Sequence, residues 1–215
     1  MSFEDVTRRW LAGWTPARGL TAAERVPDGL RTTVGDAWRE YETFALTDEP
    51  GALRRLAAGL LPRPRVEWLT VATDRVAETE AVLTGAGLEV FERPEQLMGV
   101  ELADQPRHSP AGPYRLRITE GDSSVGVTVL AGDGTEAARG WIGLAGTDAI
   151  VDRILTEPEH RRRGLGSVVM TALAGAALDR GARTGLLIAS TDGQALYGRL
   201  GWHRLADVRI AAYPA

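Results

Sequence analysis

Three arginines and two glycines stand between a strand-like run and a helix-like run in the second half of the chain. The segment reads Ile154-Leu155-Thr156-Glu157-Pro158-Glu159-His160-Arg161-Arg162-Arg163-Gly164-Leu165-Gly166-Ser167, and apolar residues then recur at helical spacing. The first turn of a helix has backbone N–H groups without intrahelical partners, and the macrodipole adds partial positive charge there. Gly164 and Gly166 leave these amides open to phosphate oxygens, and the arginines add positive charge. The segment therefore predicts a pyrophosphate-binding loop, and a solvated arginine run before an ordinary helix is the alternative.

This loop differs from the two commonest nucleotide-binding loops. No Gly-Lys-Ser/Thr follows, as a P-loop requires, and two glycines are present where a Rossmann fingerprint has three. The histidines, His108, His160 and His203, lie far apart, and the sequence contains no cysteine, so we expect no metal site. A phosphate bound here would be held by backbone amides and arginines without a metal.

The elements that must position this loop alternate between strands and helices, which predicts an α/β domain. In chain order we expect strands at residues 114–119, 125–131, 137–144 and 147–155, a helix from Leu165 to a stop at Gly181, a strand at Thr184–Ala189 and a last helix. Proline, glycine and polar residues are frequent just before the first of these strands, and we interpret residues 106–113 as a linker. The unit after the linker is therefore residues 114–215.

Two blocks of this unit carry a resemblance to a known family. The pattern Ile154-x-Thr156-x-Pro158-x-x-Arg161-x-x-Gly164-x-Gly166 resembles motif A of the GNAT acetyltransferases, usually V-x-V-x-P-x-x-[QR]-x-x-G-x-[GA]. At the family's distance, Ser190-Thr191-Asp192-Gly193-Gln194-Ala195-Leu196-Tyr197-Gly198-Arg199-Leu200-Gly201-Trp202 looks like motif B, in which a strand leads to N-x-x-A-x-x-L-Y-x-x-x-G-F. The resemblance covers about residues 114–211. It implies an α/β (α+β) GNAT fold, with a mixed, twisted sheet whose strands splay into a V.

The resemblance also implies where an acyl donor would bind. Backbone groups of Ile154, Leu155 and Thr156 would bond the pantetheine arm of acetyl-CoA in a strand-like manner, and one would polarise the thioester carbonyl. Ser190 stands where many members have asparagine, so its contact with the donor is a weaker expectation. Arg161 would lie beside the pyrophosphate. The pyrophosphate itself would rest on the loop amides of Arg162, Arg163, Gly164, Leu165, Gly166 and Ser167.

Two residues are candidates for proton transfer in the direct aminolysis of a thioester. Tyr197 occupies the family's position for a general acid, and a phenol with a pKa near 10 can protonate a departing CoA thiolate. The alternative for Tyr197 is a ring packed in the core. Asp152 lies where some members carry an acid that contacts the acceptor, and we expect it on the same face of its strand as Thr156, four residues on. It would act as a base directly or through water, and an ion pair with Arg153 or Arg139 is its alternative role.

Residues 1–105 precede the linker and read as a smaller α/β unit. It is expected to contain an amphipathic helix through Val6, Trp10, Leu11 and Trp14, helices at residues 52–61 and 76–85, and strands at residues 66–73, 88–91 and 97–102. Residues 68–74 and 185–192 both read as buried strands that end in small polar residues and an aspartate, before a helix and a short strand pair. We therefore interpret residues 30–105 as a degenerate half of the same fold. An unrelated β-α-β unit is the alternative.

The connection between the first two strands of the GNAT-like unit limits where an acceptor can bind. The family places two helices there, but the segment between residues 119 and 125 allows only a tight turn. The missing wall must come from the N-terminal unit or from a partner subunit, which leaves a homodimer open. The N-terminal unit lacks a basic glycine loop and has Leu83 or Thr84 at the position of Tyr197. We therefore expect it to cover the acceptor and not to bind CoA.

Composition narrows the classes of function. The 215 residues carry a formal net charge of −4, which disfavours nucleic acid as a partner. We find no signal-peptide pattern and no run of roughly 20 apolar residues, so we expect a cytoplasmic protein that does not enter a membrane. The expected activity is acetyl-CoA-dependent N-acetylation of a primary amine of a small molecule, by direct transfer in a ternary complex. A non-catalytic acyl-CoA-binding regulatory module and a scaffold are the alternatives. The acceptor stays open among aminoglycosides, polyamines, amino acids and protein N-termini.

Overall fold

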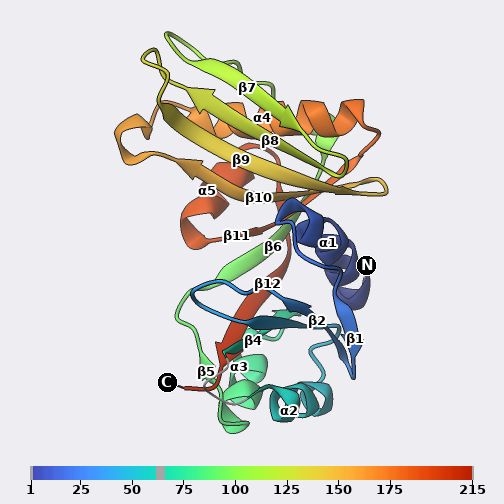
Figure 1. Cartoon of the computed structure of the whole chain (residues 1–215). Helices are drawn as coiled ribbons and strands as arrows, with labels where there is room; N and C mark the ends of the chain where they lie inside the picture. The colour runs from blue at the N-terminus through green and yellow to red at the C-terminus, as the bar shows by residue number, and fades with distance from the viewer. Residues whose placement is uncertain (1, 62–65, 215) are drawn as a thin grey trace.

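A computed structural model describes residues 2–61 and 66–214 of the protein. All strands of these residues belong to one 12-stranded sheet in the order β1-β2-β3-β4-β12-β6-β11-β10-β9-β8-β7, and β5 pairs with β12 off this path. Figure 1 shows an upper part and a lower part, which β6 and β12 join. None of the helices in the described ranges is long and apolar enough to cross a membrane. The elements are α1 (Phe3–Ala17), β1 (Glu24–Val26), β2 (Gly29–Thr33), β3 (Tyr41–Ala45), α2 (Pro50–Gly59), β4 (Glu67–Thr73), α3 (Val76–Gly85), β5 (Glu89–Val90), β6 (Glu95–Glu101), η1 (Leu102–Asp104), β7 (Arg115–Glu120), β8 (Ser124–Leu130), β9 (Glu136–Ala145), β10 (Asp148–Thr156), η2 (Pro158–His160), α4 (Leu165–Asp179), β11 (Thr184–Ala189), α5 (Thr191–Arg199) and β12 (His203–Ala212).

The upper part contains the elements expected after residue 114. β7, β8, β9 and β10 form an antiparallel meander because tight turns join them, and the turn after β7 leaves no room for helices. Alternate residues of β8, Val125, Val127 and Val129, are buried. They belong to the same apolar cluster as Val169 and Leu173 of α4, so this helix covers one face of the meander.

β10 and β11 are parallel neighbours for only three residue pairs. The last pair is Ile150 with Leu186, although β10 continues to Thr156 and β11 to Ala189. On its other side β10 stays paired with β9 as far as Thr156. The two strands therefore splay, as the resemblance implies, and within the described ranges the edge of β10 that faces β11 has no strand partner beyond Ile150.

β6 and β12 each lie between strands of both parts. β6 is antiparallel to β11 on one side and to β12 on the other, and β12 is antiparallel to β4. Outward from the β12–β6 pair, each side has a parallel pair, β4–β3 or β11–β10, followed by antiparallel strands, β2–β1 or β9–β8. α2 joins β3 to β4 as α4 joins β10 to β11. The order and direction of the strands therefore repeat in the two parts.

Two stretches of secondary structure differ from the sequence-based expectation. The sequence pattern assigns no element to residues 24–45, where the structure has β1, β2 and β3. These strands are three to five residues long, and buried Thr32, Glu42 and Thr43 obscure their apolar pattern. In place of a strand pair after α5, the chain has one long strand, β12. Its register shifts between Arg204 and Ala206, and it must reach from β6 to β4.

α1 lies along β9 and β10, on the face of the sheet opposite α4. Two bidentate pairs hold it there, Arg9 with Asp148 at 2.9 and 2.7 Å, and Arg18 with Asp152 at 2.7 and 3.1 Å. Nine helical residues rise about 13.5 Å, and four strand residues span about 13 Å. Because these lengths agree, the helix and the strand run side by side between the two ion pairs. The N-terminal unit thus supplies the wall that the short β7–β8 turn leaves out.

We expect Gly143→Ala to lower the free energy of unfolding by about 1–3 kcal/mol, the usual cost of overpacking. A Cβ atom at Gly143 of β9 would collide with the backbone carbonyl of Gly13 in α1, so the helix would have to move outward. Gly175→Ala is the matched control. Gly175 is exposed on α4, and a Cβ atom there meets nothing within 4 Å, so this variant should gain roughly 0.5–1 kcal/mol. Urea denaturation measures both changes, and an unchanged midpoint for Gly143→Ala would contradict the close contact of α1 with β9.

Candidate functional site

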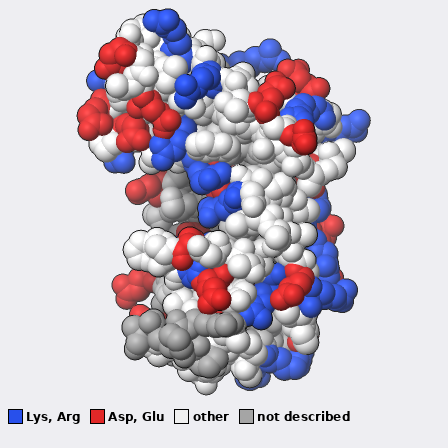
Figure 2. All heavy atoms as spheres, in the orientation of Figure 1, with Lys and Arg blue, Asp and Glu red and all other residues white. Residues whose placement is uncertain are grey.

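A cavity of about 740 Å³ lies where β10 and β11 diverge. From the upper part it is lined by residues 151–154 of β10 and by Ser190 and Tyr197 beyond β11. From the N-terminal unit it is lined by α1, the segment before β3, β3, β4 and residues 91–95. In Figure 2 the molecular surface is indented between the two parts, with acidic and basic side chains intermixed. The structure thus brings Asp152 and Tyr197 to one cavity with an N-terminal wall.

The free edge of β10 is available along the segment expected to hold a pantetheine arm. Toward β11, the backbone groups of Ile154 and Leu155 have no strand partner among the residues that the structure describes. The Thr156 carbonyl accepts a hydrogen bond from Arg161 Nε at 3.2 Å, so this oxygen is already in use. An extended ligand can therefore bond to Ile154 and Leu155 as an added strand.

A β-bulge in β10 corrects one expectation about this strand. The register with β9 shifts just after Asp152, and Arg153 has a φ of 53°. Asp152 bonds to Arg18 of α1, while Thr156 lies beside Gly166 at the start of α4. The prediction that Asp152 and Thr156 share a face is wrong, because one extra residue reverses a side-chain alternation of period two.

The turn before α4 presents a row of unused backbone donors. Arg162 and Gly164 have φ values of 62° and 76°, in the left-handed region, and Gly164 is the N-cap of α4. Within the described residues, no hydrogen bond is donated by the amides of residues 162–167. Successive free amides at a helix N-terminus form a concave site for an anion. Gly166 has a second role, since a Cβ atom there would lie 3.0 Å from the Leu196 side chain of α5.

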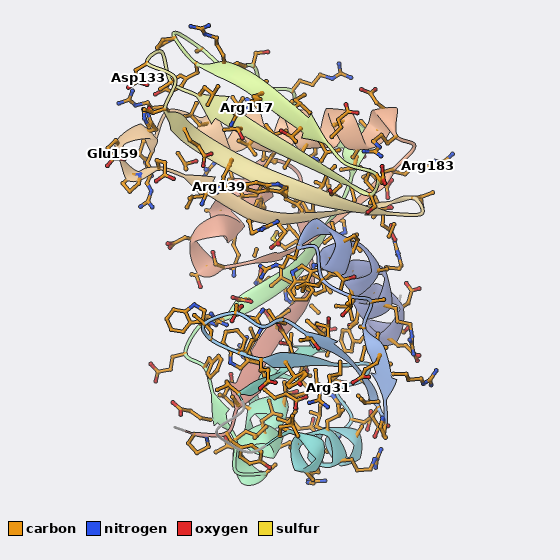
Figure 3. The ribbon with its side chains drawn as sticks, in the orientation of Figure 1. Arg31, Arg117, Asp133, Arg139, Glu159 and Arg183 are labelled. Atoms are coloured by element: carbon orange, nitrogen blue, oxygen red, sulfur yellow. The ribbon has the colours of Figure 1, made fainter. Side chains whose placement is uncertain are left out.

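The three loop arginines are exposed, and they differ in their contacts. Arg163 donates to Tyr114 Oη at 2.9 Å and to the Glu159 carbonyl at 3.2 Å. These bonds connect the loop to the residue before β7 and to the start of the loop. Tyr114 Oη also lies 3.0 Å from Nδ1 of His160. In Figure 3, Glu159 lies at the left end of the upper sheet, where β10 gives way to the loop. Arg161 donates to the Thr156 carbonyl, while the side chain of Arg162 makes no hydrogen bond or ion pair with the residues that the structure describes and can meet an incoming anion.

Tyr197 is packed in the upper core and also lines the cavity. It is only 9% exposed and belongs to the upper apolar cluster, with its ring centroid 6.1 Å from that of Trp202. It also lines the cavity, and its hydroxyl group makes no hydrogen bond within the described part of the chain. Burial, with a smaller contribution from the charge of Asp152, raises the pKa of Tyr197 to about 12. The phenol therefore stays protonated at neutral pH.

Asp152 is held by a residue that the sequence does not suggest. Arg18 bonds both carboxylate oxygens, and Arg153 Nε lies 3.5 Å from Oδ2. The expected alternative partner Arg139 instead pairs with Glu136 and Glu157. Burial works to lower the pKa of Arg18, but its hydrogen bond and attraction to Asp152 outweigh burial and raise it. Asp152 is thus an ion-paired carboxylate, with both of its oxygens bonded to Arg18.

The remaining walls carry residues to which sequence analysis assigned no role at the site. They are aromatic and charged, and include Trp38, Trp68, Phe91, Glu42, Arg93 and Glu95. They come from three separate segments within residues 38–95, so no single local spacing connects them. The sequence feature that could have indicated these walls is the set of six tryptophans, since four of them line this cavity.

Comparison with known families agrees with this geometry. Residues 122–204 match the family model described as "Acetyltransferase (GNAT) domain". This part of the chain is a GNAT domain. It contains Asp152, the amides of residues 162–167 and Tyr197. No curated protein matches the sequence.

Solved structures share the fold at low sequence identity. A GCN5-related N-acetyltransferase from Kribbella flavida is 17% identical, with a TM-score of 0.71 over 100% of this chain and 96% of that chain. A GCN5-related N-acetyltransferase from Sphaerobacter thermophilus is 12% identical, with a TM-score of 0.61 over 96% and 91%. A tandem GNAT protein from the clavulanic acid biosynthesis pathway is 13% identical, with a TM-score of 0.59 over 85% and 78%. The similarity to the first two extends over the N-terminal unit as well as the GNAT domain.

A double-mutant cycle on Arg18→Ala and Asp152→Asn should give a coupling free energy of about 1–3 kcal/mol, the range for hydrogen bonds to charged groups. The two side chains are 27% and 13% exposed, so solvent screens them weakly. The pair Arg8–Glu4 on the outer side of the same helix is 35% and 55% exposed, and a cycle there should give about 0.5 kcal/mol or less. Chemical denaturation at neutral pH measures both cycles. Equal coupling in the two pairs would mean that the Arg18–Asp152 contact does not hold α1 on the sheet.

Proposed function

We propose that this protein is an N-acetyltransferase that transfers the acetyl group of acetyl-CoA to a primary amine of a small molecule, directly and in a ternary complex. The observation that carries the proposal is the opening between β10 and β11. It has a free strand edge at Ile154 and Leu155, a row of unused amides at residues 162–167, and Tyr197 beside the cavity. The pantetheine arm would bond to the edge, and the pyrophosphate would accept hydrogen bonds from the amides.

The acyl donor and the acceptor would occupy different sides of this opening. The acyl donor would lie along β10, and the acceptor would enter from the 740 Å³ cavity, whose size is in the usual range for a small-molecule site. The amine nitrogen would attack the acetyl carbon, and the C–S bond would break to release CoA as a thiolate. Tyr197 would donate a hydrogen bond to that sulfur. With its pKa of about 12 it is a weaker acid than an ordinary thiol near 8.5, so it mainly stabilises the developing charge.

The free hydroxyl group of Tyr197 favours an enzyme over a regulatory module that only senses acyl-CoA. A binding module needs no phenol beside the cavity, whereas the hydroxyl group of Tyr197 is available there to a reacting ligand. Within the described residues, no group of three or more His, Asp or Glu side chains could hold a metal ion. The absence of a metal from the reaction stays a prediction.

We also propose that residues 30–105 are a degenerate half of the same fold, with a single CoA site per chain. The repeated strand order supports this, and so does the state of the equivalent opening between β3 and β4. There, Asp48 accepts hydrogen bonds from Thr73 at 2.8 Å and from Arg75 at 2.8 Å, which tie the two strand ends together. Glu49, and no glycine, caps α2, so carboxylates occupy the place of the phosphate loop. The division at residues 106–113 falls in a segment without helix or strand.

Acetyl-CoA should bind the EDTA-treated protein with a micromolar dissociation constant, and Gly164→Glu should abolish binding. The substitution strains a residue with a φ of 76° and places a carboxylate among the phosphate-binding amides. Gly181→Glu is the matched control, because Gly181 has a φ of 85° and is exposed at the other end of α4, so affinity should be unchanged. Isothermal calorimetry measures both. Absence of heat and of competition at millimolar CoA in the unaltered protein would sink the assignment.

Tyr197→Phe should lower turnover by roughly 10²–10³-fold, the scale of one hydrogen-bond donor to a charge that develops in the transition state, with little change in acetyl-CoA affinity. The fold should tolerate the change, because no hydrogen bond of the described structure is lost. CoA release over a panel of primary amines gives the rate. Tyr213→Phe, which removes a hydroxyl bonded to Ala57 far from the cavity, should leave turnover unchanged. Equal rates for the two variants would remove Tyr197 from the mechanism.

A further inference from the structure

The charges inside the cavity are unequally matched. Four carboxylates line it, those of Asp36, Glu42, Glu95 and Asp152. Arg18 pairs with Asp152, and Arg39 lies 3.2 Å from Asp36 and 2.7 Å from Glu42. Glu95 alone of the four makes no hydrogen bond and no ion pair with any residue that the structure describes. A half-buried carboxylate without a partner beside a cavity is suited to a cationic ligand.

Glu95 lies at the point where the reaction is expected. It begins β6, and the next residue, Gln96, pairs with Ala189 at the end of β11. Glu95 therefore comes next to Ser190, the N-cap of α5, and α5 carries Tyr197. The carboxylate and the phenol approach the cavity from neighbouring strand ends.

The surroundings of Glu95 favour a bound cation. Burial raises the pKa of Glu95, and the charge of Glu42 adds to this, while Arg93 and Arg39 oppose it. Both arginines lie over the Trp68 ring, with the guanidinium carbon of Arg39 4.2 Å and that of Arg93 4.7 Å from the ring centroid. An ammonium group would satisfy Glu95 without displacing either of them.

The rest of the neighbourhood is apolar. Phe91, Ile188 and Ile210 line the same cavity from the segment before β6, from β11 and from β12. On the far wall, Trp10 and Trp14 are stacked, with ring centroids 5.0 Å apart. A ligand with one ammonium group and an apolar body matches this lining. A ligand with several ammonium groups would leave all but one without a free carboxylate.

We propose that Glu95 binds the ammonium group of the acceptor and removes its proton, and that the acceptor is a monoamine with an apolar body. The chemical step rests on the proposed acetyl transfer. One proton passes from the ammonium nitrogen to the Glu95 carboxylate and from there to solvent. The neutral nitrogen forms the C–N bond as the C–S bond breaks, and its second proton passes to the CoA sulfur, which accepts a hydrogen bond from Tyr197. The products are the N-acetylated amine, CoA thiol and one released proton.

The binding part is tested on the full chain without any acyl donor. Calorimetry with 2-phenylethylamine should detect binding, and the uncharged 2-phenylethanol and the polycation spermidine should each bind at least about tenfold more weakly. Glu95→Gln should lower the affinity for 2-phenylethylamine by about 10–100-fold, the loss of one charge-assisted contact. Glu101→Gln, at the exposed other end of β6, is the matched control and should bind as the unaltered protein does. Equal affinity for the amine and the alcohol overturns the proposal without the use of any variant.

A second measurement separates this proposal from the assignment of acetyl transfer. In Glu95→Gln, acetyl-CoA affinity should be unchanged, while kcat/KM for 2-phenylethylamine should fall by roughly 10²–10⁴-fold. Acetyl-CoA binding without Glu95-dependent amine binding overturns the inference and leaves the acetyltransferase proposal in place. Glu95-dependent amine binding without acetyl-CoA binding supports the inference about the acceptor and defeats the proposed function.

Discussion

The pairing of β6 with β11 and β12 is the interaction on which the rest of the structure depends. β6 belongs to the N-terminal half of the chain, yet it completes the sheet of the GNAT domain on the side away from β10. β12 makes the reciprocal crossing and pairs with β4. Each half therefore lacks a sheet neighbour without the other. Because strand pairing fixes register residue by residue, the exchange also fixes which residues of one half face those of the other.

The cavity is a direct consequence of this exchange. A sheet that is continuous through β4, β12, β6 and β11 keeps the two parts at a constant separation, and the splay of β10 from β11 opens the space toward the upper part. α1 then closes one side, held by the Arg9–Asp148 pair near its middle and by the Arg18–Asp152 pair at its C-terminal end. The β7–β8 turn is short in this chain, and α1 and the lower strands line the cavity from the side of the N-terminal unit.

Side chains of the same type differ in what they can bind, because their partners within the protein differ. Asp152 and Glu95 are both carboxylates on its wall, but the first is held by a bidentate arginine and the second is not. The same reasoning separates Tyr114 from Tyr197. Tyr114 is bonded to Arg163 and positioned to hold the loop, while the Tyr197 phenol keeps its hydrogen-bonding capacity for a ligand. The groups that can bind or react at such a site are those whose hydrogen-bonding capacity is unused after folding.

The local elements of the GNAT domain could be predicted from the sequence because they depend on neighbours in the chain. The helix after Gly164 follows from the spacing of its apolar residues, and the free amides of the loop follow from the left-handed glycine and the helix start. The predicted bounds of α3 and β11 agree with the structure for the same reason. β1 to β3 escaped prediction, because short strands with buried polar residues lack a clear period. What only the tertiary structure decided is the surroundings of each functional group. Arg18 reaches Asp152 across 134 residues, a bulge turns Thr156 to the other face, and β6 brings Glu95 beside Ser190. No spacing in the sequence encodes these contacts, since they arise from strand exchange and helix docking between segments far apart in the chain.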